Sequence, residues 1–268
     1  MDQSDNGERF SGIQRLYGNV EAEQIGAMHV CVIGIGGVGS WALEALARSG
    51  VGALTLIDYD TICASNINRQ VHALKSSLGR KKIATMAERI SEINPRCQCN
   101  AIDDFITDKN LFKHLPVDGG FDFVIDAIDS IKFKAALIYH CKRNKIPVIT
   151  TGAAGGLTDP SKIMVKDLTR TFNDPLAAKV RSRLRAEHGY SRNPKRYFGV
   201  ECVFSSQQQV YPKGDGTVAF QKPGIHGVHL DCRMGYGSAT FVTATMGFVA
   251  VSRVIEKHLR RCRREQSG

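Results

Sequence analysis

The stretch His29-Val30-Cys31-Val32-Ile33-Gly34-Ile35-Gly36-Gly37-Val38-Gly39 decides the fold of this chain. Its first five residues are mostly apolar and suit a strand that is buried on both faces. The glycines that follow permit a tight turn, and the residues after them predict a helix over about 40–49. A glycine turn between a strand and a helix is a place where backbone N–H groups can face a phosphate.

This turn opens a repeating pattern of strands and helices. The expected strands cover residues 53–58, 97–102, 121–126 and 147–151, and the expected helices cover 80–93 and 131–144. Strands that alternate with helices form a parallel sheet with helices on both faces, and ligands bind at the carboxyl ends of the strands. The sequence therefore predicts an α/β fold with a Rossmann-like, doubly wound, mostly parallel sheet.

Three regions follow within what we expect to be one continuous fold. Residues 1–28 are interpreted as a polar arm and an amphipathic helix, and residues 29–156 as the nucleotide-binding core. Residues 157–268 hold a crossover, a basic segment and a C-terminal closing helix. In this last region the pattern predicts a strand over 161–168, further strands over 200–211 and 216–222, and a helix over 234–262.

The composition adds a strong positive charge. The 268 residues include 36 Lys and Arg against 26 Asp and Glu, a formal charge of +10. An excess of this size suits a polyanionic partner such as RNA. The eight cysteines follow a polar N-terminus without an apolar leader. We therefore expect free thiols in a reducing compartment and a cytoplasmic protein.

An uncharged stretch, residues 234–252, lies between Arg233 and Arg253 and is long enough to cross a bilayer. Its many Gly, Ala, Ser and Thr residues lower its hydrophobicity and suit close packing inside a protein. We expect a buried helix here, and membrane association through residues 234–252 is the alternative.

Charged side chains follow the strands at the edge where a ligand would bind. Asp58 ends the second strand, where a carboxylate can accept hydrogen bonds from ribose hydroxyls. Arg69 and Lys82 can compensate the negative charge of a triphosphate and of a departing pyrophosphate. A dehydrogenase does not need these two cations in its site. Asp129 follows the fourth strand, where an acid can hold Mg²⁺ against phosphates. The glycine turn alone would also suit NAD, FAD or S-adenosylmethionine, but together these residues favour ATP.

The order of these motifs resembles the E1-like adenylating superfamily, which includes the MoeB, ThiF and ubiquitin-activating proteins. The resemblance rests on the glycine turn, Asp58-Tyr59-Asp60, Ser65-Asn66-Ile67-Asn68-Arg69-Gln70, Lys82 and Asp126-Ala127-Ile128-Asp129-Ser130. It implies catalytic roles for Asp129, Arg69 and Lys82, with Asp129 at Mg²⁺. The implied ATP-binding set is Gly34, Gly36, Gly37, Gly39, Asp58, Asp60, Asn66, Arg69, Gln70, Lys82, Asp129 and Arg15.

The resemblance also implies a homodimer in which an N-terminal arginine of one subunit enters the ATP site of the other. The strict family position of this arginine falls on Gly12, and Arg15 is the residue expected to act in its place.

The cysteines depart from the family pattern. The paired Cys-x-x-Cys motifs are absent and Cys202 stands alone where a pair is expected, so no zinc is expected. No cysteine lies between residues 142 and 201, which leaves no crossover thiol for a thioester or persulfide relay to a ubiquitin-like protein. The relay activity of the family is therefore disfavoured.

A basic segment points to another substrate. Residues 170–196 carry eight Lys or Arg and two acids, and clusters of this kind neutralise nucleic-acid phosphates. The tail, residues 257–264, is also basic. The expected tRNA-binding residues are Arg170, Lys179, Arg181, Arg183, Arg185, Arg192, Lys195 and Arg196.

Over nearly its whole length the chain resembles the bacterial tRNA threonylcarbamoyladenosine dehydratase family. The likeness includes Asn68-Arg69-Gln70-Val71-His72-Ala73-Leu74 and Asp174-Pro175-Leu176-Ala177-Ala178-Lys179. It implies ATP-dependent adenylation of the carboxylate of N6-threonylcarbamoyladenosine at position 37 of tRNAs that read ANN codons. Cyclisation then releases AMP, and because the substrate supplies its own nucleophile no enzyme cysteine is required.

Three other functions stay open. The chain could be a MoeB/ThiF-type adenylyltransferase for a ubiquitin-like sulfur carrier, an NAD-dependent oxidoreductase, or a non-catalytic tRNA-binding module. The resemblance also leaves room for a partnership with a cysteine desulfurase and sulfur-acceptor system.

Overall fold

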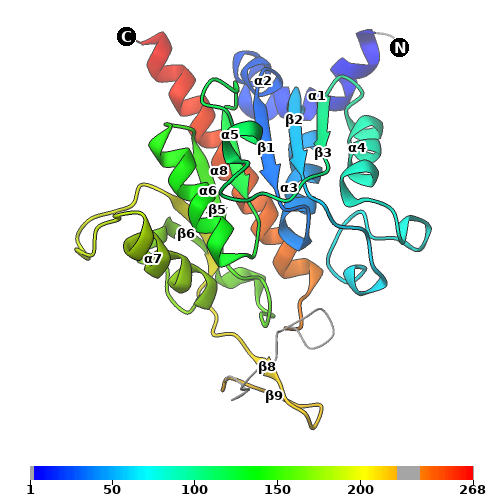
Figure 1. The fold of residues 1–268 in the computed structure, drawn as a ribbon. Coiled ribbons are helices and arrows are strands. Elements are labelled where there is room, and N and C mark those ends of the chain that lie inside the picture. Colours follow the sequence, from blue (N-terminus) through cyan, green and yellow to red (C-terminus); the bar gives the residue numbers. More distant parts are fainter. Residues whose placement is uncertain (1–2, 222–235, 268) are drawn as a thin grey trace.

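The computed structural model describes residues 3–221 and 236–267, and its central feature is a seven-stranded sheet (Figure 1). The strand order is β3-β2-β1-β4-β5-β7-β6. Six strands run parallel, and β6 pairs antiparallel with β7. The predicted mostly parallel, Rossmann-like sheet is confirmed. The strands are β1 (His29–Ile33), β2 (Ala53–Ile57), β3 (Gln98–Ile102), β4 (Phe123–Asp126), β5 (Val148–Thr151), β6 (Ile163–Asp167) and β7 (Glu201–Ser205).

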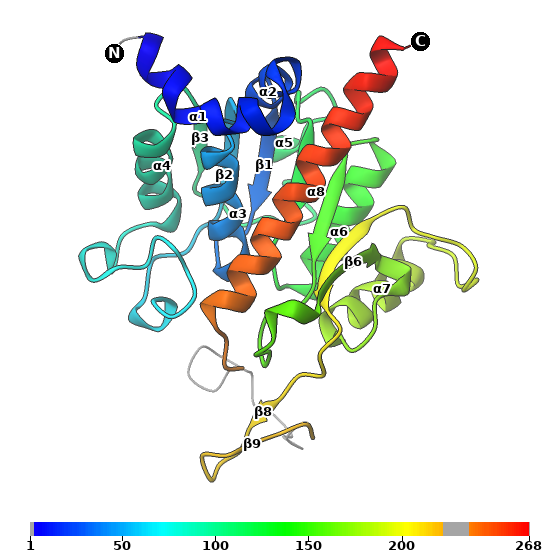
Figure 2. The same ribbon diagram turned by 180° about the vertical axis from the view of Figure 1, so that it is seen from behind.

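Helices cover both faces of this sheet. On one face lie α3 (Gly37–Arg48), α4 (Lys82–Ile93) and α8 (Thr240–Gln266), which Figure 2 shows in front. On the other lie α5 (Leu111–His114), α6 (Ile131–Arg143) and α7 (Pro175–Glu187). At the amino end of the sheet, where the parallel strands begin, lie α1 (Gln3–Tyr17) and α2 (Asn19–Gly26), and α2 lies close to α8.

The central strand β1 separates two apolar cores. Val30 and Val32 pack in the core under α3 and α8, whereas Cys31 and Ile33 pack in the core under α6. Successive side chains of a strand point to opposite faces, so a strand between two helix layers needs apolar residues at every position. This requirement explains the uninterrupted apolar run that marks β1 in the sequence.

The C-terminal helix is a packed part of the fold along its first half. Val242, Met246 and Ala250 are buried, and a Cβ on Gly247 would lie 2.8 Å from the Val38 carbonyl oxygen of α3. Within residues 3–221 and 236–267, no helix combines the length and the apolar character needed to span a membrane. The predicted helix over 234–262 had the wrong bounds: residues 236–239 precede the helix, with Ala239 extended, and α8 continues to Gln266. Residues 232–235 lie outside the described part of the chain.

Two other expectations need correction. Residues 3–26 form two helices rather than an arm and one helix, because Gly18 breaks the chain between them at a φ of +97°. Of the strands expected over 200–211 and 216–222, only β7 joins the main sheet. The short β8 (Tyr211–Pro212) and β9 (Val218–Ala219) pair with each other in a separate two-stranded sheet.

Candidate active site

The glycine turn lies at the carboxyl end of β1, and each of its glycines has a different reason to lack a side chain. Gly34 has a φ of +86°, and a Cβ there would lie 2.9 Å from the backbone of Ala127. A Cβ on Gly39 would lie 1.9 Å from the Gly34 carbonyl oxygen. Gly36 has no atom within 4 Å of its Cβ position, so its outer side is open to a ligand. A helix leaves the N–H groups of its first turn without intrahelical partners, so those of α3 are available to a ligand at this turn.

Asp58 holds the glycine turn against the segment that follows β2. Its Oδ2 accepts a hydrogen bond from the Ile35 N–H at 2.6 Å, and its Oδ1 accepts one from the Asp60 N–H at 2.8 Å. The carboxylate is largely buried. Each of its oxygens has capacity for a second hydrogen bond, so a ribose hydroxyl could still bind there.

Lys82 and Asp60 form an ion pair beside this turn. The Lys82 ammonium lies 2.7 Å from the Asp60 carboxylate, with the lysine side chain 7% exposed and the aspartate 46% exposed. Lys82 is the first residue of α4, so its position is fixed by the helix start. Because its carboxylate partner is exposed, the buried Lys82 ammonium is accessible to a phosphate. The phosphate could displace Asp60 or bind the ammonium together with it.

The segment that carries Asn66, Arg69 and Gln70 is a tight turn. The Asn66 carbonyl accepts hydrogen bonds from the Arg69 and Gln70 N–H groups, each at 3.0 Å. The Asn66 side chain in turn accepts one from the Cys63 N–H at 3.1 Å. Arg69 is partly exposed, and its guanidinium donates to the Ser65 carbonyl at 2.6 Å. Arg69 is therefore partly exposed on a turn that several hydrogen bonds hold in place.

The start of α8 supports the same turn from the far end of the sequence. The Asn68 side chain donates to the Ser238 carbonyl at 2.7 Å, and Thr240 donates to the Asn68 carbonyl at 2.5 Å. The Trp41 indole N–H of α3 donates to the Arg69 carbonyl at 3.0 Å. This support was not predicted from the sequence, since a contact across 170 residues leaves no local pattern.

A buried ion pair closes the end of β4. Asp126 is fully buried, and its carboxylate lies 3.0 Å from the Lys134 ammonium and accepts a 2.6 Å hydrogen bond from Thr150. Burial raises the pKa of Asp126, and the opposing effects of Lys134 and Thr150 do not cancel that shift. Lys134 was not predicted as a site residue, although its spacing from the buried Ile138 and Cys141 of α6 places it on the inner face of that helix.

Asp129 lies in the exposed loop after β4, near the other acids. The carboxylates of Asp60, Asp58 and Asp129, together with partial burial, raise the pKa of Tyr59. Among the described residues no set of three or more His, Cys, Asp or Glu side chains could hold a metal ion by itself. An ion here would need oxygen ligands from phosphates or water.

An aromatic row beside these acids was also missed. Tyr59 packs edge-on against Phe105 with ring centroids 4.9 Å apart, and Phe105 packs against Phe133 at 5.0 Å. Tyr59 and Phe105 are both exposed. The three residues come from three separate loops or helices, so only the fold brings them together.

Arg15 lies away from the glycine turn of its own chain. It is exposed in the last turn of α1. That helix is fixed at the amino end of the sheet, because Arg9 donates to the Glu92 carbonyl at the end of α4 and Phe10 lies against Gly50. The glycine turn is at the opposite end (Figure 1).

The basic residues of the 170–196 segment differ in solvent exposure and in their partners within the chain. Arg181 is half-buried and donates to the Thr171 hydroxyl and the Leu168 carbonyl, and burial lowers its pKa. Arg183 pairs with Glu187 at 2.9 Å, and Arg185 lies over the Phe198 ring. The exposed members are Arg170, Lys179, Arg192, Lys195 and Arg196.

Cys202 is buried in β7, and burial raises the pKa of its thiol. Cys63 is exposed beside the candidate site, and Cys232 lies outside the described residues. A buried, protonated thiol is a poor nucleophile, so Cys202 is unsuited to a relay.

The model of the ThiF family matches residues 11–265 of the chain. The tRNA threonylcarbamoyladenosine dehydratase of Escherichia coli (strain K12) is 52% identical over 259 residues, which cover 96% of each protein. The chain belongs to the ThiF family and, within it, to the tRNA threonylcarbamoyladenosine dehydratases.

Two further comparisons place this dehydratase among its relatives. A crystal structure of the Escherichia coli dehydratase in complex with ATP has a TM-score of 0.86 at 48% identity, and the match covers 96% of both chains. The molybdopterin-synthase adenylyltransferase of Haemophilus influenzae is 30% identical over 152 residues, 57% of this chain. The likeness to the dehydratases is thus both stronger and longer, and it extends past the nucleotide-binding half of the chain.

Proposed function

We propose that this chain is an ATP-dependent dehydratase that converts N6-threonylcarbamoyladenosine at position 37 of tRNA to its cyclic form, with release of AMP and pyrophosphate. The observation that carries this proposal is the full-length likeness to the Escherichia coli dehydratase. A sulfur-carrier adenylyltransferase receives less support, because its relatives match about half of the chain and Cys202 is buried.

The ATP would lie across the carboxyl ends of β1 and β2. The open side of Gly36 and the first-turn N–H groups of α3 would hold its phosphates. Lys82, Arg69 and Asn66 would face the β- and γ-phosphates, and Asp58 would bind the ribose. Asp60 and Gln70 complete the set as neighbours of Lys82 and Arg69.

The first chemical step activates a poor electrophile. A free carboxylate resists attack at its carbon because its oxygen is a poor leaving group. One carboxylate oxygen of the substrate attacks the α-phosphorus of ATP, the bond to the bridging oxygen breaks, and pyrophosphate leaves. Lys82 and Arg69 would stabilise the negative charge that develops on the departing group.

The second step closes a ring within the substrate. A heteroatom of the carbamoyl group attacks the activated carbonyl carbon and loses its proton, and AMP leaves. Because the nucleophile is already attached to the electrophile, proximity can supply up to ~7–11 kcal/mol of the barrier in favourable cases. The buried Cys202 is consistent with a reaction that uses no enzyme thiol.

Mg²⁺ is proposed as the metal cofactor, with Asp129 as its protein ligand. Mg²⁺ is commonly bound through one or two carboxylates together with substrate phosphates and water. Asp129 is exposed, and its carboxylate raises the pKa of Tyr59 together with those of Asp60 and Asp58, which suits such a site. When bound, the ion would neutralise phosphate charge.

The proposed assembly is a homodimer bound to tRNA. Since Arg15 lies at the far end of its own sheet, it could reach an ATP site only in a partner subunit. The exposed cations of the 170–196 segment would contact tRNA phosphates. A cysteine desulfurase system is proposed as a protein partner, on the ground of the family resemblance alone.

The direct test is a mass measurement. The protein is incubated with ATP, Mg²⁺ and tRNA that carries N6-threonylcarbamoyladenosine, and the nucleoside is then weighed. Loss of one water together with AMP formation is expected. Consumption of ATP without that mass loss, or AMP transfer to a sulfur-carrier protein, would refute the proposal.

A further inference from the structure

The amino end of the sheet carries a hollow that the proposed reaction does not use. Its volume is about 540 Å³, and it lies between the end of α6, the last turns of α8 and the chain at Gly199. Phe123 and Val148, at the starts of β4 and β5, form its floor. The glycine turn follows the carboxyl end of β1 in the same parallel sheet, so this hollow is separate from the candidate active site.

The hollow is lined by positive charge. No acidic side chain belongs to its lining, which consists of described residues throughout. The floor is apolar but buried, so the accessible wall is basic. The basic lining residues are Lys142, Lys145, Lys257, Arg260, Arg261 and Arg264.

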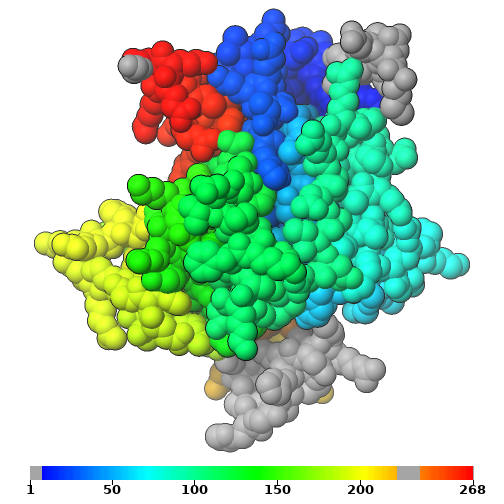
Figure 3. All heavy atoms as spheres, turned by 45° about the horizontal axis from the view of Figure 1, so that its top comes forward, coloured from blue at the N-terminus to red at the C-terminus, as the bar shows by residue number. Residues whose placement is uncertain are grey.

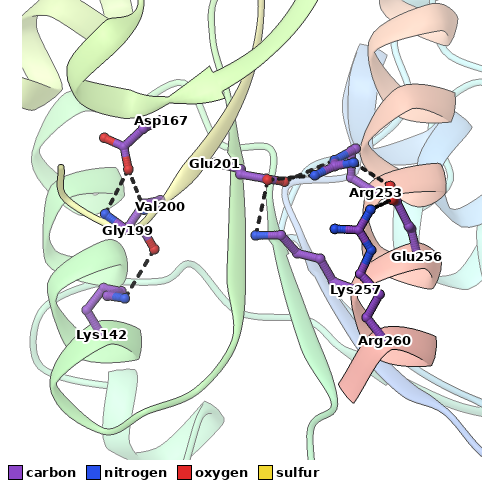
Figure 4. Close-up of polar contacts among 9 residues, drawn as sticks. All are labelled: Lys142, Asp167, Gly199, Val200, Glu201, Arg253, Glu256, Lys257 and Arg260. Atoms are coloured by element: carbon purple, nitrogen blue, oxygen red, sulfur yellow. Dashed lines mark hydrogen bonds and ion pairs between the residues drawn. The ribbon is translucent and has the colours of Figure 1, made fainter. Parts of the chain in front are cut away.

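The acids nearby are already bound to cations. Glu201 pairs with Arg253 at 2.8 Å and with Lys257 at 3.3 Å, as Figure 4 shows. Glu256 pairs with both Arg253 and Arg260. Arg261 pairs with Asp122 and Glu265. These four carboxylates are shared among a larger number of Lys and Arg side chains, so a net positive charge remains at the hollow.

Two of the cations have no such compensation. Within residues 3–221 and 236–267, neither the Lys145 ammonium nor the Arg264 guanidinium has a hydrogen-bond or ion-pair partner. Lys142 only donates to the Gly199 carbonyl, at 3.1 Å (Figure 4). These side chains are available to an anion.

The backbone at Lys145 adds an independent observation. Lys145 follows α6 at a φ of +57°, and the next N–H, of Ile146, closes back to the Cys141 carbonyl at 2.8 Å. This is the helix-ending position that glycine occupies at least cost, because any side chain is strained there. Lys145 therefore occupies a backbone position that glycine would adopt at lower cost.

We propose that this hollow is a second tRNA contact, which binds the phosphate backbone of the substrate away from the adenylation site; the inference rests on the proposed tRNA substrate. The cations are spread over two helices rather than converging on one point, which suits an extended polyanion better than a single phosphate. A membrane surface is disfavoured, because a peripheral membrane site needs exposed apolar anchors and the apolar lining here is buried.

The geometry allows one RNA to reach both ends of the sheet. The four residues of β4 span roughly 13 Å at about 3.3 Å per residue. A nucleic-acid duplex rises roughly 3 Å per base pair, so a stem of several base pairs covers this distance. Figure 3 shows the red end of α8 and the yellow segment before β7 toward the same side of the molecule, and that segment carries the exposed Arg192, Lys195 and Arg196.

Charge reversal tests the contact. The double variant Lys145→Glu/Arg264→Glu is compared with Arg96→Glu/Lys109→Glu, which removes the same charge from exposed residues outside the hollow. Binding of the modified tRNA is measured across a range of salt concentrations. The hollow variant should bind on the order of tenfold more weakly and lose about 1.5 from the slope of log K against log salt, whereas the control should keep the parental slope. Equal losses in both variants would overturn the proposal, since they would reflect net charge alone.

A second variant separates binding from folding. Lys145→Gly should raise the melting temperature, because glycine relieves the left-handed backbone, and should still weaken tRNA binding. Loss of binding in a more stable protein cannot come from misfolding. Unchanged binding by this variant and by the double variant would overturn the contact.

The remaining outcomes distinguish the two proposals. If the parent forms AMP and dehydrates tRNA but the hollow variants match it in KM, the function stands and the hollow contact fails. If the parent neither binds nor dehydrates the tRNA, the proposed function fails first. Vesicles of phosphatidylserine and phosphatidylcholine provide the last arm: vesicle binding that depends on Lys145 and Arg264, with unchanged tRNA binding, would assign the hollow to a membrane instead.

Discussion

The two ends of the parallel sheet handle charge in opposite ways. At the carboxyl end the charged groups are held by partners within the chain: Asp58 by backbone N–H groups, Lys82 by Asp60, and Asp126 by Lys134. At the amino end several cations share a few carboxylates, and Lys145 and Arg264 have none among the described residues. One end has fixed geometry, and the other has excess charge.

This difference matches two kinds of binding. Adenylation requires a carboxylate oxygen, a phosphorus atom and a leaving group in line, so its site benefits from side chains that are already positioned. A phosphate backbone presents similar charges along its length, and side chains that bind it need charge more than fixed positions.

Breaking the buried pair at the carboxyl end should damage the fold itself. Lys134→Met leaves Asp126 buried without its counter-charge, and loss of one partner of a buried ion pair typically costs about 3–5 kcal/mol. The free energy of unfolding is measured in urea. Lys132→Met, an exposed lysine on the same helix, is the control and should change it little. A loss below about 1 kcal/mol for Lys134→Met would mean that the pair does not hold this end of the sheet.

Removing both partners should cost less than removing one. In Lys134→Met/Asp126→Leu no buried charge is left, and replacement of a buried pair by apolar residues is often close to neutral. The double variant should therefore be more stable than Lys134→Met alone.

Much of the fold was predictable because buried parallel strands leave a strong local pattern. The run 29–33 is apolar at every inward position on both faces, and the strand predictions there and at 53–58, 97–102, 121–126 and 147–151 are confirmed within a residue or two. The end of the chain was harder. The uncharged stretch 234–252 gave no marker for where the helix begins, and Thr240 became its start because residues 236–239 are held by the turns at Gly156 and Asn68.

The candidate site was predictable where it depended on short motifs. The glycine turn, Asp58, Asn66, Arg69 and Lys82 follow successive strands, and the topology brings those strand ends together. Lys134, the aromatic row at Phe105 and the support from Ser238 arise from contacts between distant segments. In the basic segment 170–196, composition gives no reason to separate Arg181 from the other cations. Only the fold shows that Arg181 is half-buried.

The adenylation site should be sensitive to one carboxylate without losing its fold. Asp129→Asn should lower the rate of AMP formation by about 10²–10³, because a preorganised electrostatic group at a phosphate-transfer site contributes on this scale. Asp129 is exposed, so the melting temperature should stay at the parental value. Asp108→Asn changes an exposed aspartate away from this site and should keep full activity. Parental dehydration by the Asp129 variant would remove this residue from the proposed mechanism.

The exposed cations of the 170–196 segment should contribute to tRNA binding, whereas the half-buried Arg181 should contribute to stability. Reversal of Arg192, Lys195 and Arg196 should weaken tRNA binding by on the order of tenfold and reduce its salt slope, since these side chains are exposed. Arg181→Ala should instead lower the melting temperature, because it removes hydrogen bonds to Thr171 and Leu168. If Arg181→Ala altered the salt slope and left stability unchanged, exposure would be the wrong guide to the RNA surface.

The smallest effect is expected where an acid fixes the loop beside the amino-end hollow. Asp167 accepts hydrogen bonds from the N–H groups of Phe198, Gly199 and Val200, the last two shown in Figure 4. Burial alone would raise the pKa of Asp167, but these bonds and those from Thr169 outweigh it and lower the pKa.

Since the folded pKa lies below the unfolded one, the stabilisation is complete above about pH 4 and is lost as the pH falls through the lowered folded value. The protection of the Gly199 amide against hydrogen exchange should therefore fall as the pH drops through that acid range. In Asp167→Asn this acid step should vanish and protection should already be lower at neutral pH, by about 1–2 kcal/mol. Asp118→Asn, an exposed aspartate, should keep the step. If the step persisted without Asp167, another group would hold the loop, and the amino end would be less dependent on this single carboxylate than the carboxyl end is on Asp58.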